Sequence, residues 1–252
     1  MIPLAWKEGE NEETYEAHIN NMLNLWRGNF RNAYLPSLSR IIGSDKGYVN
    51  DLIEIMIILH DLGKLFIGYQ KTLRKEERII SRAEYRHEIV SAALTFFVLP
   101  VSEELYVISG AILSHHEPIL MGQVSRYAEP YLTVTDVERR LRKNCGDVIE
   151  FNPDGIRWTR EKLKEYSFNF SSNLPVEVEI DEILDKIKEL MLMLCVKCSP
   201  ERKATLRLKV SALGTLLSII DSVAANRSRK LDDGGTFITR RAEKSEVSLL
   251  WL

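Results

Sequence analysis

Residues 50–64 read "NDLIEIMIILHDLGK", an apolar segment that ends in a histidine, an aspartate, a glycine and a lysine. Its apolar side chains would fall on almost every side of a helix, which predicts a buried central helix. Gly63 stands where a helix often stops with a residue in the left-handed conformation. His60 and Asp61 place two metal-binding side chains next to each other. That dipeptide alone has a real false-positive risk, so its context decides its meaning.

Helical periodicity continues through most of the chain. "EETYEAHINNMLNLW" has apolar residues at spacings of three and four, and "DEILDKIKELMLMLCVK" also reads as a helix. Pro100 ends one predicted helix. Five sites have the residue pattern of a helix start: Asn11, Ser81 with Glu84, Ser102, Thr135 with Glu138, and Ser199 with Pro200.

Residues 147–178 have a less regular pattern. "DVIEFNPDGIRW" can form a short hairpin around Pro153–Gly155. The tail "GTFITRRAEKSEVSLLWL" can be extended and can pack back through Trp251. No internal repeat or clear linker divides the chain. The sequence predicts one all-α domain over residues 1–252, a helical bundle with a variable insert at about 120–178 and a short extended C-terminal tail.

The composition is that of an ordinary soluble globular protein. The 252 residues carry a net charge of −2, with 45% hydrophobic and 28% charged residues. This charge neither requires nor excludes a nucleic-acid partner. Three cysteines and an N-terminus that turns acidic early fit a reducing compartment and no secretory signal. No apolar stretch reaches the roughly 18 residues that span a membrane. We expect a cytoplasmic protein without a membrane partner.

All five histidines lie in or at the end of a predicted helix, at 18, 60, 87, 115 and 116. A single histidine on an apolar face is more often a hydrogen-bonded core residue than a ligand. Five such histidines would each need a separate buried partner, so this alternative is weaker for the set. Imidazole and carboxylate together suit Zn, Mn, Fe, Co and Ni, and Mg where oxygen ligands dominate.

The adjacency of His60 and Asp61 has a physical use. Neighbouring side chains on a helix point about 100° apart. At a helix end they can reach two ions, and the two oxygens of Asp61 can bridge ions that lie roughly 3.5–4 Å apart. The pair His115–His116 fits the same logic. Asp221, in the apolar "LLSIIDSVAAN", is the candidate for a second carboxylate because an unpaired carboxylate there is unfavourable; a buried arginine or a helix cap is the alternative.

These residues, in this order, look like the HD superfamily of metal-dependent phosphohydrolases. Three segments resemble the HD nuclease of type I CRISPR interference: "HDLGKLFIGYQ", "RHEIVSA" at 86–92, and "AILSHHEP". Glu117 follows the double histidine where many members have glycine, which we interpret as a loop difference. The chain has no GxxxxGK[ST] loop and no helicase motifs, so the resemblance implies a nuclease subunit whose helicase is a separate polypeptide.

The resemblance also implies an HD-domain helical bundle and two divalent metal ions. One ion would be held by His18, His60, Asp61 and Asp221, and the other by Asp61, His87, His115 and His116. Mg or Mn is expected, with Ni, Co, Fe or Zn as alternatives. A hydroxide between the ions would attack phosphorus. Asp61 and Lys64 would be catalytic, with the Lys64 ammonium near the phosphate; a solvated loop lysine is the alternative.

Basic side chains cluster near two of these segments: Lys71, Arg74, Lys75, Arg78, Arg82 and Arg86, then Arg227, Arg229 and Lys230. They can guide a phosphate backbone. A solvated face laced with salt bridges is an equal alternative, because glutamates are interspersed. Phe66, Tyr69 and Tyr85 can stack on bases or belong to the core. Cys195 and Cys198 lack further zinc ligands and are interpreted as buried thiols.

The leading functional hypothesis is a metal-dependent nuclease that cuts single-stranded DNA. It would work with a CRISPR helicase and an RNA-guided surveillance complex. The alternative is an HD phosphohydrolase that acts on a nucleotide or cyclic nucleotide, and a third class is a regulatory protein with a degenerate site. An open groove would favour the nuclease, whereas an enclosed ligand site would favour the nucleotidase.

Overall fold

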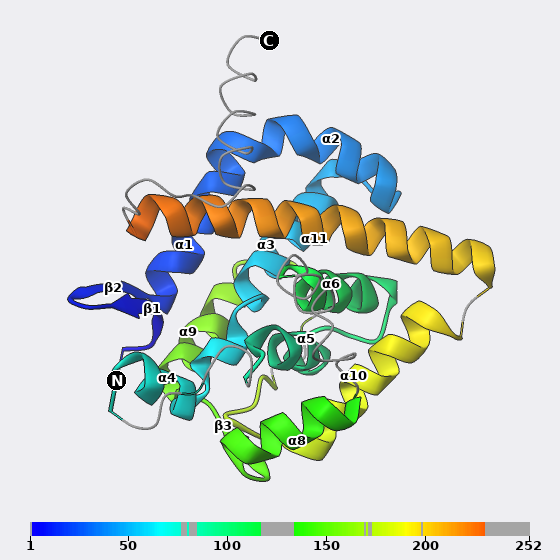
Figure 1. The fold of residues 1–252 in the computed structure, drawn as a ribbon. Helices are drawn as coiled ribbons and strands as arrows, with labels where there is room; N and C mark the ends of the chain where they lie inside the picture. Colours follow the sequence, from blue (N-terminus) through cyan, green and yellow to red (C-terminus); the bar gives the residue numbers. More distant parts are fainter. Residues whose placement is uncertain are drawn as a thin grey trace, which may run out of the picture.

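The computed structural model describes residues 2–76, 80, 85–116, 134–168, 170, 173–197 and 199–229. The described part is predominantly helical, which confirms the all-α fold class (Figure 1). The tail from residue 230 onward, and the part of the insert at 117–133, lie outside the described residues. The helical elements are α1 Tyr15–Leu25, η1 Trp26–Phe30, α2 Arg31–Ile42, α3 Lys46–Leu59, η2 Leu62–Leu65, α4 Ile67–Leu73, α5 His87–Val98, α6 Glu103–Ser114, α8 Val134–Cys145, α9 Pro153–Leu163, α10 Ile180–Cys195 and α11 Pro200–Arg229.

Two short antiparallel hairpins accompany the helices. Strands β1 (Leu4–Glu8) and β2 (Asn11–Thr14) pair at the N-terminus, and β3 (Val148–Glu150) pairs with β4 (Glu177–Glu179). The second pairing corrects the predicted hairpin at residues 153–155. That turn is instead the start of α9, where Pro153 occupies the first turn and the Asn152 side chain accepts a hydrogen bond from Gly155 N at 3.0 Å.

The predicted central helix is α3, and all of its residues from Leu52 to Leu59 are buried. In Figure 1 the long helix α11 runs across the molecule, with α2 on one side and α6 on the other. It packs against α1, α2 and α6. This packing brings α11, which contains Asp221, against α1, which contains His18, and against α6, which is followed by His115.

The stretch Pro200–Ser228 of α11 is long and apolar enough to cross a membrane by length and composition. The expectation that no segment reaches this length was therefore wrong. The reading missed it because charged residues at the start of the helix precede an apolar second half. A core helix passes the same test, and α11 packs against α1, α2 and α6, among other helices.

Several predicted helix starts are displaced. Asn11 lies in β2, and Thr14 is the N-cap of α1, where its side chain accepts from Ala17 N at 3.1 Å. The N-cap of α5 is Arg86 and not Ser81, which lies outside the described residues, as does Glu84. Thr135 lies inside α8, which begins at Val134. Ser102 does cap α6, and α11 begins at Pro200 as predicted.

Gly63 does not adopt the left-handed conformation expected of it. The helix α3 ends at Leu59, and the chain continues through the 3-10 turn η2, which contains Gly63. A Cβ atom at this position would lie 2.3 Å from the carbonyl oxygen of His87. Close approach of two backbone segments, and not a positive φ, therefore requires glycine here.

Candidate metal centre

Eight side chains, which lie in or next to five helices and one turn, come together at one place. His60 is the C-cap of α3 and Asp61 follows it, while Lys64 lies in η2. His115 is the C-cap of α6 and His116 comes next. The other members are His18 in α1, His87 at the start of α5, and Asp221 in α11. The seven predicted ligands are His18, His60, Asp61, His87, His115, His116 and Asp221, and every one of them takes part in the atom groups and contacts described below.

Asp61 occupies the middle of this cluster. Its Oδ1 lies 3.1 Å from Nε2 of His87, and its Oδ2 lies 3.3 Å from Nε2 of His60. Nε2 of His18 is 3.6 Å from the same Oδ2. The two carboxylate oxygens therefore face different histidines. This is the geometry that a bridging carboxylate needs, and both the carboxylate and His60 are fully buried.

Asp221 joins the cluster from the far end of the chain. Its Oδ1 lies 3.1 Å from Nε2 of His18. Three groups have ligand atoms that all lie within 4.8 Å of one another: His18 with His60 and Asp61, His60 with His115 and Asp221, and His87 with His115 and His116. The middle group crosses the division into two ligand sets that the family resemblance implies. His60 and His115 thus lie where the two sets meet.

Backbone contacts fix the orientation of two imidazoles. Nδ1 of His60 donates to the carbonyl oxygen of Ile57 at 2.7 Å, and Nδ1 of His115 donates to that of Ile112 at 2.5 Å. A carbonyl oxygen can only accept, so the proton resides on Nδ1. In the neutral ring the lone pair is then on Nε2, which points into the cluster. Neutral imidazole is the form that binds metal ions.

Several of the converging atoms lack a hydrogen bond within the described part of the chain. Nε2 of His60, His87 and His115, and Oδ1 of Asp61, are buried and have no partner of hydrogen-bond geometry there. Leaving such atoms unsatisfied is unfavourable by about 1–3 kcal/mol for each group. Imidazole nitrogen and carboxylate oxygen atoms that converge in this way fit divalent cations.

Histidines in the cluster have pKa values that are shifted in opposite directions. Burial by itself lowers the pKa of His18, but the carboxylates of Asp221 and Glu13 outweigh it and raise the pKa to about 9. Burial, then the neighbouring His60, lowers the pKa of His115 to about 4. Burial, His115 and His87 together also lower the pKa of His116. The imidazoles on the α6 side are therefore neutral at physiological pH and available as ligands.

The two carboxylates are ionised. Burial opposes ionisation of Asp61, but His60 and Lys64 outweigh it and hold the pKa well below its ordinary value. Burial likewise opposes ionisation of Asp221, and His18 outweighs it and lowers the pKa. For Lys64, burial lowers the pKa, whereas Asp61 and Asp221 raise it above the ordinary value. Lys64 is 7% exposed and its Nζ lies 2.7 Å from Oδ2 of Asp61, so it is no solvated loop lysine.

Ser91, Tyr85 and Gln70 hold the η2 turn in place, and the sequence patterns gave Ser91 and Gln70 no role. Gly63 N donates to Oγ of Ser91 at 2.8 Å, and the Tyr85 hydroxyl donates to the carbonyl oxygen of Gly63 at 2.7 Å. Gln70 donates to the carbonyl oxygens of Lys64 at 2.6 Å and Leu4 at 2.8 Å. Ser91 and Gln70 lie inside two of the segments that carry the family resemblance, and that position was the available signal.

The three aromatic candidates are described, and so is one of the two thiol candidates. Phe66, Tyr69 and Tyr85 are all buried, which favours their reading as core residues over base stacking. Cys195 is half-buried and free, while Cys198 lies outside the described residues.

The predicted nucleic-acid residues are only partly described. A guanidinium nitrogen of Arg74 donates to the carbonyl oxygen of Ile2. Arg86 is buried and paired with Glu88, so it belongs to the interior and not to a basic surface. Lys71 and Lys75 lie in or after α4, and Arg227 is exposed on α11. Arg78 and Arg82, with Lys230, lie outside the described residues, as does the side chain of Arg229.

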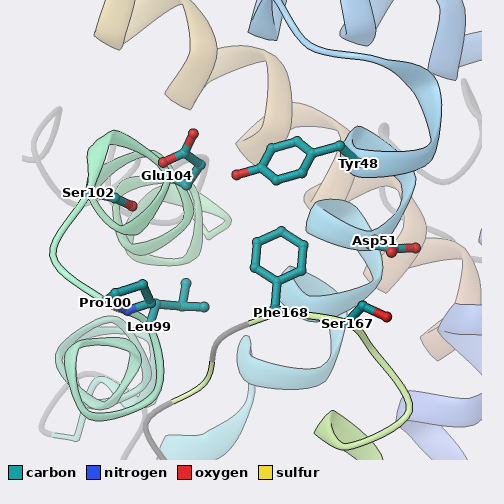
Figure 2. A pocket seen from close by; sticks show the side chains of 8 residues that line it. All are labelled: Tyr48, Asp51, Leu99, Pro100, Ser102, Glu104, Ser167 and Phe168. Atoms are coloured by element: carbon teal, nitrogen blue, oxygen red, sulfur yellow. The ribbon is translucent and has the colours of Figure 1, made fainter.

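A cavity of about 450 Å³ lies apart from the histidine cluster. Tyr48 and Phe168 stack on one wall, with ring centroids 5.1 Å apart, and Leu99, Pro100 and Ser102 face them (Figure 2). The remaining lining residues are Asp51, Glu104 and Ser167. The lining includes two carboxylates and no basic side chain, so this cavity does not suit a phosphate group.

Comparison with known proteins identifies three relatives, all described as CRISPR-associated endonuclease Cas3-HD. The Pyrococcus furiosus protein is 34% identical over 161 residues, which cover 60% of this chain and 66% of the relative. The Methanocaldococcus jannaschii protein is 31% identical over 144 residues, 53% of this chain and 57% of the relative. These two alignments thus cover less than two thirds of the relatives' own length. The Thermoproteus tenax protein is 27% identical over 243 residues and 94% of both chains.

The fold has a counterpart among solved structures. The CRISPR-associated Cas3 HD domain protein of Methanocaldococcus jannaschii superposes with a TM-score of 0.58 at 21% sequence identity, covering 84% of this chain and 97% of that one. No protein-family model matches the chain. The chain thus has the fold of an HD domain, and the histidines and aspartates converge within that fold. In sequence, the chain is similar to the Cas3-HD proteins of CRISPR systems.

Proposed function

We propose that this protein is a metal-dependent nuclease of CRISPR interference that hydrolyses phosphodiester bonds in single-stranded DNA. The observation that carries the proposal is the position of Asp61, whose two oxygens face His87 on one side and His60 and His18 on the other. One carboxylate can then serve two ions. The description of three relatives as CRISPR-associated endonucleases supports the reaction class.

In this proposal His18, His60, Asp61 and Asp221 hold one divalent ion. Asp61, His87, His115 and His116 hold the other, with Mg or Mn as the expected metals. A pair of divalent ions supplies a water-derived nucleophile and neutralises charge on the phosphate. The backbone contacts of His60 and His115 keep both Nε2 atoms directed at the ions.

Lys64 is the proposed group that meets the substrate. Asp61 and Asp221 keep the lysine protonated in spite of its burial. The Gln70 side chain holds the Lys64 carbonyl oxygen, and so fixes the backbone that carries the ammonium. An ammonium fixed in this way can stabilise the charge that develops on a phosphate oxygen in the transition state.

The proposed partners are a CRISPR helicase subunit and an RNA-guided surveillance complex, which would deliver the single strand. Support for these partners comes from the similarity of the chain to three relatives described as CRISPR-associated endonuclease Cas3-HD. The basic side chains Lys71, Arg74, Lys75, Arg78, Arg227 and Arg229 are the proposed contacts to the DNA backbone.

The test is a cleavage assay on single-stranded and double-stranded DNA of one sequence, with Mg, Mn, Ni, Co, Fe and Zn in turn. Cyclic nucleotides serve as competing substrates. We expect single-strand cleavage that needs a divalent metal and is absent in Asp61→Ala. Asp185→Asn is the matched control, because it removes an exposed carboxylate paired only with Lys188 among the described residues.

Two results would overturn the proposal. Cleavage by Asp61→Ala at the wild-type rate would remove the metal mechanism. Faster turnover of a cyclic nucleotide than of DNA would favour the alternative, an HD phosphohydrolase that acts on nucleotides.

A further inference from the structure

A buried carboxylate lies behind His18, on the side away from the cluster. Oε1 of Glu13 is 3.4 Å from Nδ1 of His18, which is an ion-pair distance without the geometry of a hydrogen bond, while Nε2 of the same ring faces Asp61 and Asp221. Glu13 is 6% exposed and His18 is fully buried. Neither the sequence patterns nor the proposed ligand sets gave Glu13 a role.

The local structure dictates this contact. Thr14 caps α1, so Glu13 occupies the position just before the cap and His18 occupies the fourth helical position. Side chains at these two positions meet across the first turn, and in many helices they form an apolar pair. Here the pair is a carboxylate and an imidazole. The hairpin fixes Glu13 from the other direction, because Glu13 pairs with Trp6 across β1 and β2.

The groups that contact Nδ1 of the other histidines are different. Backbone carbonyl oxygens hold Nδ1 of His60 and His115. Oε2 of Glu88 lies 3.6 Å from Nδ1 of His87, but Glu88 is also engaged by Arg86. Histidine ligands of metals usually donate their second N–H to a carboxylate or a carbonyl oxygen, which fixes the ring and raises its basicity. Only on the His18 side does a carboxylate from the N-terminal hairpin provide that support among the described residues.

We propose that Glu13 is a positioning residue for the metal ion on the His18 side of the centre. Its carboxylate accepts the Nδ1 proton of His18 and holds Nε2 toward Asp61 and Asp221. This inference rests on the proposed ligand sets and adds that Glu13 acts on one of the two sites. Loss of Glu13 weakens the binding of the ion on the His18 side and leaves the binding of the ion at His87, His115 and His116 unchanged.

The test is calorimetric titration of the metal-free protein with Mn. We expect two ions for the wild type. Glu13→Leu removes the acceptor and should lower the affinity for one ion about 10–100-fold, the usual effect of removing the hydrogen-bond partner of a histidine ligand. Glu13→Gln keeps an oxygen acceptor and loses the charge, so its loss should be smaller. The matched control is Glu12→Gln, one residue earlier on the same strand, where the carboxylate is exposed and paired with Lys7.

Two further readouts separate positioning from folding. A double variant of Glu13→Leu with His18→Ala should bind Mn no more weakly than His18→Ala alone, because Glu13 acts through His18. The electron paramagnetic resonance spectrum of Glu13→Leu, at a Mn concentration that fills only the tighter site, should be that of an isolated ion. Circular dichroism checks that each variant is folded.

The outcomes distinguish this inference from the proposed function. Two Mn ions bound at wild-type affinity by folded Glu13→Leu, or equal weakening of both, would overturn the role of Glu13 and leave the nuclease proposal intact. Two bound ions that depend on Glu13 as expected, in a protein that cuts no DNA, would overturn only the nuclease proposal. A wild type that binds no Mn would overturn both.

Discussion

Asp61 has contacts with four side chains at once, from His18, His60, Lys64 and His87. In the absence of metal it is the counter-charge of a buried lysine. Removing one partner of a buried ion pair destabilises a protein by about 3–5 kcal/mol, because the other charge is left alone. Asp61 is thus expected to contribute both to metal binding and to the stability of the metal-free protein.

The first prediction compares thermal melts of wild type, Asp61→Ala and Lys64→Ala, with and without Mn. Metal should raise the melting temperature of the wild type, because ligand at about 100 times its dissociation constant adds about 2.7 kcal/mol. Asp61→Ala should melt lower without metal and gain little from Mn. Lys64→Ala should keep the Mn stabilisation and lose DNA cleavage, since the lysine acts on the phosphate. Full Mn stabilisation of Asp61→Ala would contradict the ligand assignment.

The second prediction concerns Gly63, where a substitution adds atoms to the side chain. The Cβ of Gly63→Ala would meet the backbone of His87 at 2.3 Å, and backbone cannot rotate away as a side chain can. We expect a loss of about 1–3 kcal/mol in the free energy of unfolding, measured by urea denaturation. Metal affinity should fall as well, because α5 carries His87 and η2 carries Lys64.

Gly28→Ala is the matched control. A Cβ at Gly28 would meet nothing within 4 Å, and this glycine has no positive φ. The control should be neutral or stabilising by up to about 1 kcal/mol. Equal stability of Gly63→Ala and wild type would show that η2 and α5 can separate freely.

Between elements, a partly buried polar network joins η1, α3 and the insert. Nε of Arg27 donates to Oε1 of Glu54 at 3.0 Å, and the Tyr166 hydroxyl donates to Oε2 at 2.7 Å. Burial raises the pKa of Glu54, but Arg27 and Tyr166 outweigh burial and leave the pKa below its ordinary value of 4.5. The network holds the middle of α3, and His60 and Asp61 directly follow the C-terminal end of that helix.

The prediction for this network concerns pH. A pKa that is lower in the folded state means that the ionised Glu54 stabilises the fold at pH values above 4.5. The contribution should disappear as the pH falls below 4.5 and through the folded pKa. A double-mutant cycle of Arg27→Met and Glu54→Gln should give a coupling of about 1–2 kcal/mol near neutral pH and a smaller one in acid. Coupling that grows in acid would contradict this sign.

For the molecule as a whole, the proposed function requires a path by which a DNA backbone can reach the candidate metal centre. Arg227 follows Asp221 by six residues on α11, which is about 9 Å along a helix axis. Lys71 lies in α4, the helix that also holds the buried Gln70. These positions would allow basic side chains to approach a strand that enters the centre.

We therefore predict that cleavage of long single strands weakens as salt rises, with a slope of roughly 0.7 per phosphate contact. Hydrolysis of a small phosphodiester should change much less. Arg227→Ala and Lys71→Ala should each reduce the slope, whereas Lys188→Ala, which removes a lysine paired with Asp185, should not. Equal salt dependence for both substrates would return the basic clusters to an ordinary solvated surface.

The helical architecture could be predicted because it depends on local patterns. Apolar spacing of three and four indicated α1, and a nearly all-apolar segment indicated α3. The motif around His60 and Asp61 indicated residues of the candidate metal centre. The ends of the elements were predicted less well. Asn11 and Thr14 are both good helix caps, and pairing of β2 with β1 decides that the helix starts after Thr14.

The environment of the site lay beyond local patterns. His18 and Asp221 are 203 residues apart, and only the packing of α11 against α1 brings their side chains within 3.1 Å. The reason for glycine at 63 is likewise a neighbour, the His87 carbonyl oxygen, and no property of its own φ angle. Glu13 looked like one acidic residue among several in "GENEET" until the hairpin buried it against His18.

The residue types that can bind metal and their order along the helices are written in the chain, because side-chain chemistry and helical periodicity are local properties. Which oxygen of Asp61 faces which imidazole, and which pKa values rise or fall, follow from burial and from charges contributed by distant segments. Those quantities depend on distances between elements, and tertiary packing alone sets such distances.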